Sequence, residues 1–196
     1  MLKNIKSSYF IQLVYTYVEF AQKLKLIKYN KYLQNLTGIH FSNYKYFSGK
    51  YIIYESNGIG KEYDGHNDIL IYEGEYLNGQ RNGKGKEYYD YGPLKFEGEY
   101  TFGYKLKGKL YINNNLEYEG EYLYDKKWNG KGYDENGNVI YELINGNGKV
   151  KEYNYDGIIE FEGEYLNGKR NGKGKEYNYD GTLKFEGEYL NGKRKA

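Results

Sequence analysis

Three residue patterns in this sequence are of types that could carry chemistry. Glutamates two positions apart, such as Glu97 and Glu99, lie on one side of an extended strand, where they could serve a glycosidase or bind a cation. The segment 79–85, GQRNGKG, is similar to a phosphate-binding loop. The side chains of His40 and His66 could each donate a nitrogen to a metal. Each of these patterns also has a structural interpretation.

The surrounding sequence favours the structural interpretation in every case. The glutamate pairs recur along the chain, whereas a catalytic pair is needed once, so we expect them on solvated strand faces. The glycine segment has three residues between Gly79 and Gly83 where a Walker loop has four, and it lacks the following Ser or Thr. Neither histidine has a second ligand at metal-binding spacing, and the chain has no cysteine. We therefore expect no catalytic residue, no cofactor and no metal.

A short pattern recurs along most of the chain. The segment Tyr72-Glu73-Gly74-Glu75-Tyr76-Leu77 has copies that begin at Phe96, Tyr118, Phe161 and Phe185, and weaker copies that begin at Phe47 and Tyr141. These seven copies indicate a repeat array over residues 47–196, in which the last copy is truncated. The repeat-defining aromatic and glycine residues are Tyr72, Gly74, Tyr76, Phe96, Gly98, Tyr100, Tyr118, Gly120, Tyr122, Phe161, Gly163, Tyr165, Phe185, Gly187 and Tyr189.

A second element follows each copy and predicts a second strand. Its clearest form is the segment 83–88, GKGKEY, with matches at 58–63 and 172–177 and looser ones at 130–133 and 146–153. Asn-Gly and Asp-Gly pairs lie in the connections, as is typical of hairpin turns with positive φ. Each repeat is therefore expected to form two short strands, and the array to form an antiparallel β-meander.

Two registers are open for these hairpins. A three-residue loop at 180–182 places Tyr177 on the same face as Phe185, which gathers the aromatic side chains together. A two-residue turn instead opposes Lys175 to Glu186 and distributes the aromatic side chains over both faces. We favour the aromatic register, because cross-strand aromatic pairs contribute about 0.2–1 kcal/mol each.

The segments 72–85 and 161–174 resemble the MORN repeat. The resemblance covers about residues 47–196, although the tyrosines after Gly-Lys-Gly stand one place later than in the commonest form, nearer the bacterial antitoxin-like subtype. It implies an elongated, twisted antiparallel sheet. In that family such sheets serve protein scaffolding, self-association and, by an older proposal, phospholipid binding.

Residues 1–46 contain no repeat and predict a small α-helical segment. Apolar residues from Phe10 to Val18 and from Leu24 to Leu33 have the spacing of two amphipathic helices, and Ser7 or Ser8 could cap the first. We interpret the pair as a cap on the end of the sheet. The alternatives are an adaptor-binding module, since this stretch loosely resembles an F-box, or a basic helix on an anionic membrane.

Charge divides the chain in the same place. Residues 1–46 carry seven lysines and one acidic residue, whereas residues 47–196 carry 22 basic and 26 acidic residues. Mildly acidic repeats disfavour nucleic acid as a partner. No stretch approaches the roughly 18–20 apolar residues of a membrane-spanning helix, and we expect no signal peptide. The lack of cysteine fits a reducing compartment, so we expect a cytoplasmic protein.

Together these patterns favour a non-enzymatic scaffold that binds another protein or a second copy of itself. Strand 185–190 predicts an open edge through which a homodimer could form. One alternative is peripheral attachment to anionic phospholipid through residues 1–46 and the basic turn residues Arg81, Arg170 and Arg194 with their neighbours. Another is an antitoxin-like or adaptor partner protein.

Overall fold

The structure is a computed structural model that describes residues 15–19, 22–23, 30–39, 45 and 48–195. The chain divides into two compact units, Met1–Tyr51 with Tyr63–Asp68 and Ile52–Glu62 with Ile69–Ala196, and each is described by itself. Among the described residues, no helix is long and apolar enough to cross a membrane.

The first unit contains one helix with clear boundaries, α3 (Lys31–Thr37). The Asn30 side chain accepts a hydrogen bond from the Leu33 N–H at 3.1 Å, and Gly38 ends the helix in the left-handed conformation. Leu33 and Tyr15 are buried. Helix α3 overlaps the second expected helix only at residues 31–33, because residues 24–29 lie outside the described residues, as do Ser7, Ser8 and most of the first expected helix.

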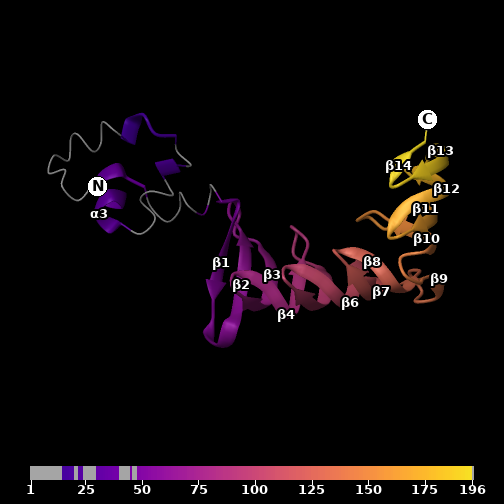
Figure 1. The fold of residues 1–196 in the computed structure, drawn as a ribbon, viewed down its shortest axis with the longest axis horizontal. Coiled ribbons are helices and arrows are strands. Elements are labelled where there is room, and N and C mark those ends of the chain that lie inside the picture. Colours follow the sequence, from indigo (N-terminus) through magenta and orange to yellow (C-terminus); the bar gives the residue numbers. More distant parts are fainter. Residues whose placement is uncertain (1–14, 20–21, 24–29, 40–44, 46–47, 196) are drawn as a thin grey trace. The chain divides into compact units, whose positions relative to one another are not determined.

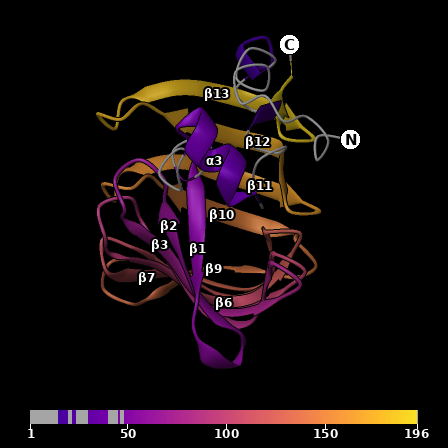
Figure 2. The same cartoon turned by 90° about the vertical axis from the view of Figure 1, so that its left-hand side faces the viewer.

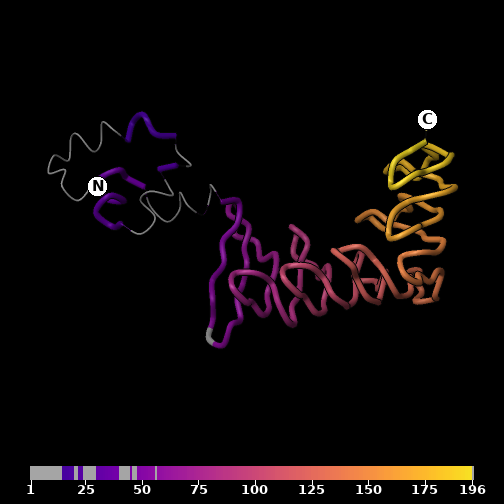
Figure 3. The backbone as a smooth tube through the Cα atoms, in the orientation of Figure 1, coloured from indigo at the N-terminus to yellow at the C-terminus, as the bar shows by residue number. Residues whose placement is uncertain are grey.

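The repeats form two antiparallel sheets in which strands follow one another in sequence order (Figures 1 and 3). This confirms the expected β-meander. The nine-stranded sheet comprises β1 (Lys50–Tyr54), β2 (Ile59–Asp64), β3 (Leu70–Leu77), β4 (Gln80–Tyr88), β5 (Leu94–Thr101), β6 (Tyr104–Ile112), β7 (Asn115–Leu123), β8 (Lys126–Tyr133) and β9 (Val139–Leu143), with the 3₁₀ turn η2 (Ser56–Gly58) between β1 and β2. The five-stranded sheet comprises β10 (Gly148–Tyr153), β11 (Ile159–Leu166), β12 (Lys169–Tyr177), β13 (Leu183–Leu190) and β14 (Lys193–Arg194).

Glycines paired across neighbouring strands make room for aromatic rings. Gly98 stands opposite Gly108, and a Cβ atom on Gly98 would lie 2.7 Å from the Gly108 Cα and 2.8 Å from the Phe96 ring. Any side chain at Gly98 would therefore displace both the ring and the adjacent strand. The same arrangement recurs at Gly163, which pairs with Gly174 beside the Phe161 ring.

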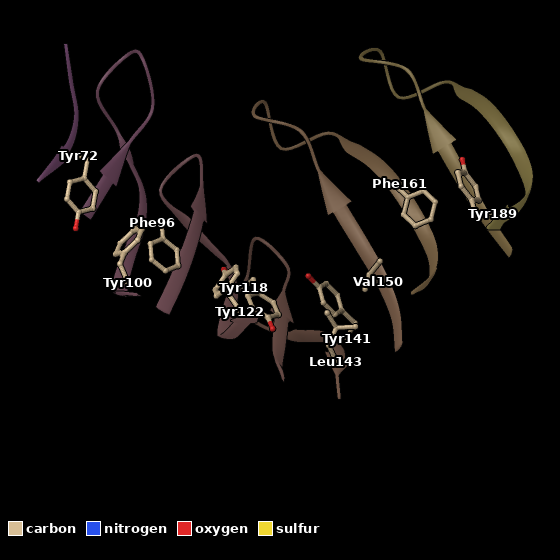
Figure 4. Packing of buried hydrophobic residues seen from close by; sticks show 10 residues of the cluster. All are labelled: Tyr72, Phe96, Tyr100, Tyr118, Tyr122, Tyr141, Leu143, Val150, Phe161 and Tyr189. Atoms are coloured by element: carbon tan, nitrogen blue, oxygen red, sulfur yellow. The ribbon is translucent and has the colours of Figure 1, made fainter. Parts of the chain in front are cut away.

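The rings gather on one face of each sheet and form the core (Figure 4). Phe96 and Phe161 have no exposed surface. Neighbouring rings meet edge to face, for example Phe96 with Tyr122 at 5.4 Å between centroids and Phe161 with Tyr189 at 5.2 Å. Such pairs contribute about 0.5–1.5 kcal/mol beyond their burial, so a single layer of aromatic side chains holds consecutive repeats together.

The observed register is the charge-pairing one, so our preference for the aromatic register is wrong. Lys175 stands opposite Glu186, and the register shifts at a bulge between Glu176 and Tyr177. The loop is closed by two backbone hydrogen bonds, from Asn178 N–H to Thr182 O and from Gly181 N–H to Asn178 O. Phe185 therefore stands opposite Glu176, and Tyr177 stands opposite Leu183, so the two rings are not paired across the strands.

Hairpin turns lie on both sides of the strands (Figure 2). The turns on one side are hydrogen-bonded to one another. The Asn167 N–H donates to Asn147 Oδ1 at 2.9 Å, and the Gly168 N–H donates to Gly146 O at 2.9 Å. The Asn191 N–H likewise donates to Asn171 Oδ1. Turn donors thus bind the preceding repeat, which fixes the spacing of the hairpins.

The row of paired glycines is interrupted where the two sheets separate. Leu143 stands opposite Gly130, and Val150 stands opposite Gly163, so both occupy positions in that row. Both side chains are buried. Between β9 and β10 there is only an isolated bridge beside the turn, Ile144 to Asn147. Side chains in place of the glycine pair prevent close approach of the two backbones, which explains the break inside the weakest repeat.

The last repeat has a short second strand. Leu190 stands opposite Lys193, and the Lys195 N–H donates to Glu188 O. The expected open edge along 185–190 is therefore covered over its final three residues, because the chain folds back after the turn. Dimerisation through the rest of that edge stays a prediction.

The packing predicts opposite tolerance at two neighbouring positions of β11. Gly163→Val places a side chain between the Phe161 ring and the Gly174 backbone, each 2.7 Å from the new Cβ, and should lower the free energy of unfolding by about 3 kcal/mol or more. Glu164→Val changes the opposite face and should cost less than about 1 kcal/mol. Thermal melts of both variants measure the difference, and equal losses would contradict this assignment of faces.

Candidate binding surface

The face opposite the rings carries alternating strands of glutamate and lysine. Glu97 of β5 stands opposite Lys86 of β4 on one side and Lys109 of β6 on the other. The same alternation runs through the five-stranded sheet, where Glu162 of β11 stands between Lys151 and Lys175. We call this surface the charged face. Its rows of charge change sign from each strand to the next.

The charged face is hollowed into a groove on each sheet. The groove of the nine-stranded sheet encloses about 840 Å³, and its floor is the backbone of the paired glycines. That of the five-stranded sheet encloses about 630 Å³. A side chain at these glycine positions would point towards the rings, because successive strand residues alternate between the two faces. The floor between the charged rows is therefore strand backbone.

Ion pairs along the charged face are loose and exposed. Lys107 Nζ lies 3.3 Å from Glu99 Oε1, and Lys109 Nζ lies 3.9 Å from Glu119 Oε1. The Lys107 and Glu99 side chains are 59% and 37% exposed. Exposed pairs of this kind contribute about 0–1 kcal/mol each, so these side chains can exchange partners at little cost.

Tyrosines at the bulges orient some of these glutamates. The Tyr177 hydroxyl donates to Glu162 Oε1 at 2.7 Å, and the Tyr111 hydroxyl donates to Glu97 Oε1 at 2.7 Å. The hydrogen bond to Glu162, together with burial, raises the pKa of Tyr177 to about 12. Tyr177 therefore belongs to the charged face, and our placement of it beside Phe185 is wrong. Tyr177 shares a face with Lys175 by strand alternation, and in the observed register Phe185 stands opposite Glu176.

A second ionic network lies on the ring face, and sequence reasoning missed it. Arg81 lies over the Tyr72 ring, 4.2 Å from its centroid, and its Nη2 atom is 3.2 Å from Glu62 Oε2. The Tyr76 hydroxyl donates to the same oxygen at 2.9 Å. A cation thus covers a ring while a carboxylate binds both the cation and a neighbouring tyrosine.

This network repeats along the array. Arg170 lies over the Phe161 ring at 4.2 Å, and it pairs with Glu152, which also accepts from Tyr165. Lys105 and Lys127 take the place of arginine in the middle repeats, over Phe96 and Tyr118 respectively. The spacing from glutamate to tyrosine to cation could have revealed part of the network, because it is the same in Glu152, Tyr165 and Arg170 as in Glu176, Tyr189 and Arg194.

The network occupies the arginines that were expected to contact lipid. The Arg81 and Arg170 side chains are 19% and 23% exposed and lie in the core network. Arg194 pairs with Glu176 at 2.7 Å. The Arg81 and Arg170 guanidinium groups therefore hold the repeats together, whereas the Arg194 side chain is 43% exposed and lipid contact through it stays a prediction. Lipid attachment through residues 1–46 stays a prediction, because most of that segment lies outside the described residues.

The residues first considered for chemistry fall into structural settings. Glu97 and Glu99 are members of the charged face, and the segment 79–85 lies in the β3–β4 turn and β4. His66 is exposed in a turn where its N–H donates to Asp64 Oδ1, while His40 lies outside the described residues. Within the described part of the chain, no group of three or more His, Cys, Asp or Glu side chains could hold a metal.

Glu176 predicts a pH dependence for the last repeats. Burial raises the pKa of this carboxyl, but hydrogen bonds from Arg194, Lys184 and Tyr189 lower it by more. The net effect is a pKa of about 2, compared with an ordinary value of 4.5. The folded-state pKa is the lower one, so the stabilisation is present above about pH 4.5 and is lost as the pH falls towards 2. Urea unfolding at several pH values should show that the free energy of unfolding falls less steeply with decreasing pH for Glu176→Gln than for the unaltered chain. Parallel curves would contradict this role of Glu176.

Comparisons with known proteins identify the repeats. The MORN repeat model matches residues 72–91 and 161–183. No curated protein matches the chain. Among solved structures, the chain is 14% identical to TarM, covering 79% of this chain and 24% of that one, with a TM-score of 0.21. A mutant TarM from S. aureus, in complex with fondaparinux, alpha-GlcNAc-glycerol and UDP, is also 14% identical, with 92% and 26% covered and a TM-score of 0.21.

The chain spans about a quarter of the length of these solved structures. The two family matches coincide with the hairpins β3–β4 and β11–β12, whose paired glycines and overlying rings recur in β5–β6 and β7–β8. The chain therefore contains MORN repeats at residues 72–91 and 161–183.

Proposed function

We propose that this protein is a non-enzymatic scaffold whose charged face binds another protein. The observation that carries the proposal is the pair of open grooves, about 840 and 630 Å³, floored by glycine backbone and lined by alternating glutamate and lysine strands. The opposite face is filled by buried rings and the cations over them, so it offers less room for a partner.

The alternation of charge favours a protein partner. Neighbouring strands lie about 4.8 Å apart, so the sign of the charge changes every 4.8 Å or so along the groove. A polyanion such as nucleic acid would meet a glutamate strand at every second step. A polypeptide can carry both signs at the required intervals, and it can bond to the exposed groups through side chains and backbone. The alternation would then determine partner choice and register.

The setting of the carboxylates supports a role without catalysis. Glu97 and Glu99 each stand opposite lysines of both adjacent strands. The carboxylates of the ring face are bound by cations and tyrosines, as Glu62 is by Arg81 and Tyr76. Both sets therefore have a structural role that recurs from repeat to repeat.

Charge reversal within the groove tests the proposal. Lys86→Glu with Lys109→Glu puts glutamates on both sides of Glu97 and should abolish partner binding, because the alternation is lost over three strands. The measurement is quantitative co-purification from the native host with the intact chain and with the variant as bait. Melting curves show whether the variant stays folded, and the milder pair Lys86→Gln with Lys109→Gln serves if it does not.

The matched control is Lys169→Glu, which reverses an exposed lysine at the β11–β12 turn outside either groove. It should retain the partners of the unaltered chain. The proposal fails if the folded groove variant captures the same partners in the same amounts. Binding of anionic vesicles in place of any protein would favour the lipid alternative.

A further inference from the structure

Two hairpin turns of the nine-stranded sheet differ from the others on their side. The turns of β3–β4, β9–β10, β11–β12 and β13–β14 carry Asn-Gly at their centres, whereas β5–β6 carries Phe102-Gly103 and β7–β8 carries Tyr124-Asp125. The two unusual turns are adjacent, because the Lys105 N–H donates to Asp125 Oδ1 at 2.8 Å. Aromatic residues therefore replace asparagine at neighbouring points of the array.

Neither backbone preference nor burial accounts for these aromatic residues. Phe102 and Tyr124 have φ values of 48° and 49°, in the left-handed region that disfavours L side chains other than Asn and Asp. Their side chains are 71% and 69% exposed, so they gain little from packing within the chain. An unfavourable conformation combined with an exposed ring indicates that a contact outside the chain stabilises it.

Other exposed apolar side chains join these two rings. Tyr104 meets Tyr124 edge to face at 5.5 Å between centroids, and both rings are exposed. Leu106 and Leu123 belong to the same two hairpins and are 43% and 42% exposed. We call the five residues Phe102, Tyr104, Leu106, Leu123 and Tyr124 the turn patch. Exposed apolar side chains grouped on two neighbouring hairpins in this way mark an interaction site.

The charges beside the turn patch point to its occupant. The three neighbouring turn segments 77–80, 101–104 and 123–126 contain two charged residues, Asp125 and Lys126, which are consecutive and opposite in sign. A two-fold axis that passes between these two residues, at the edge of the turn patch, would set each Asp125 against Lys126 of the other copy. A symmetric contact requires a surface that is complementary to itself, and this pair of charges meets that requirement.

We propose that the turn patch is the contact between two copies of this chain in a symmetric dimer. The rings of one copy pack against those of the other, edge to face as Tyr104 and Tyr124 already do within one copy. The two Asp125–Lys126 pairs align the copies. The contact is separate from the grooves of the charged face, so a dimer would present those grooves twice.

The test restores the residue found in the other turns. Phe102→Asn with Tyr124→Asn should make the chain monomeric over a concentration series in which the unaltered chain dimerises, as measured by sedimentation equilibrium. Because asparagine accepts the left-handed conformation, the melting temperature of the dissociated variant should be equal to or higher than that of the unaltered monomer. A loss of dimer through unfolding would instead lower that temperature.

Two further variants separate the patch from general effects. Leu166→Asn removes an exposed apolar side chain from the β11–β12 hairpin and should leave the dimer unchanged. Lys126→Asp should weaken the dimer, since it sets acid against acid across the axis. The proposal is overturned if the unaltered chain is monomeric throughout the series, or if the Asn variant dimerises as the unaltered chain does. Equal dimerisation of Lys126→Asp would overturn the symmetric arrangement.

Discussion

The contact between an aromatic ring and a pair of glycines on adjacent strands is the constraint on which this structure depends. A ring such as Phe96 can lie flat only where Gly98 and Gly108 expose bare backbone. Each ring then reaches the next repeat edge to face, and consecutive hairpins are held at a fixed distance. Aliphatic side chains are therefore scarce, and tyrosine and glycine take their place as the core-forming residues.

The same constraint separates the two faces chemically. On the ring face, buried charge is tolerated because each cation lies over a ring and is paired with a carboxylate. Arg81, for example, lies over Tyr72 and pairs with Glu62, which also accepts a hydrogen bond from the Tyr76 hydroxyl. On the other face, glutamates and lysines line an open groove whose floor is strand backbone. Strand alternation thus places the aromatic core and the charged groove on opposite faces of the same strands.

The sequence predicts the period, the number of repeats, the strands and the meander, because these follow from local spacing and turn chemistry. It does not predict the register, since aromatic pairing and charge pairing imply different alignments, and the structure has the charge pairing of Lys175 with Glu186. The charged face could be predicted only in part: the recurrence of Glu97 and Glu99 indicated a solvated face but not a groove. The ring-face network was missed because its members, such as Glu152 and Arg170, come from different repeats.

Hydrogen exchange at the junction of the two sheets tests the central claim most directly. Alternate amides of a strand point to the same side, so the Glu142 amide points towards β10, as the Ile144 amide does. At that junction Leu143 and Val150 replace the glycine pair, and β9 and β10 form no ladder. The Glu121 amide occupies the matching place before the β7–β8 turn, where the glycine pair is intact. We predict that in the intact chain Glu142 exchanges much faster than Glu121. Equal protection of the two amides would show that strands pair without the glycines, and would contradict the account.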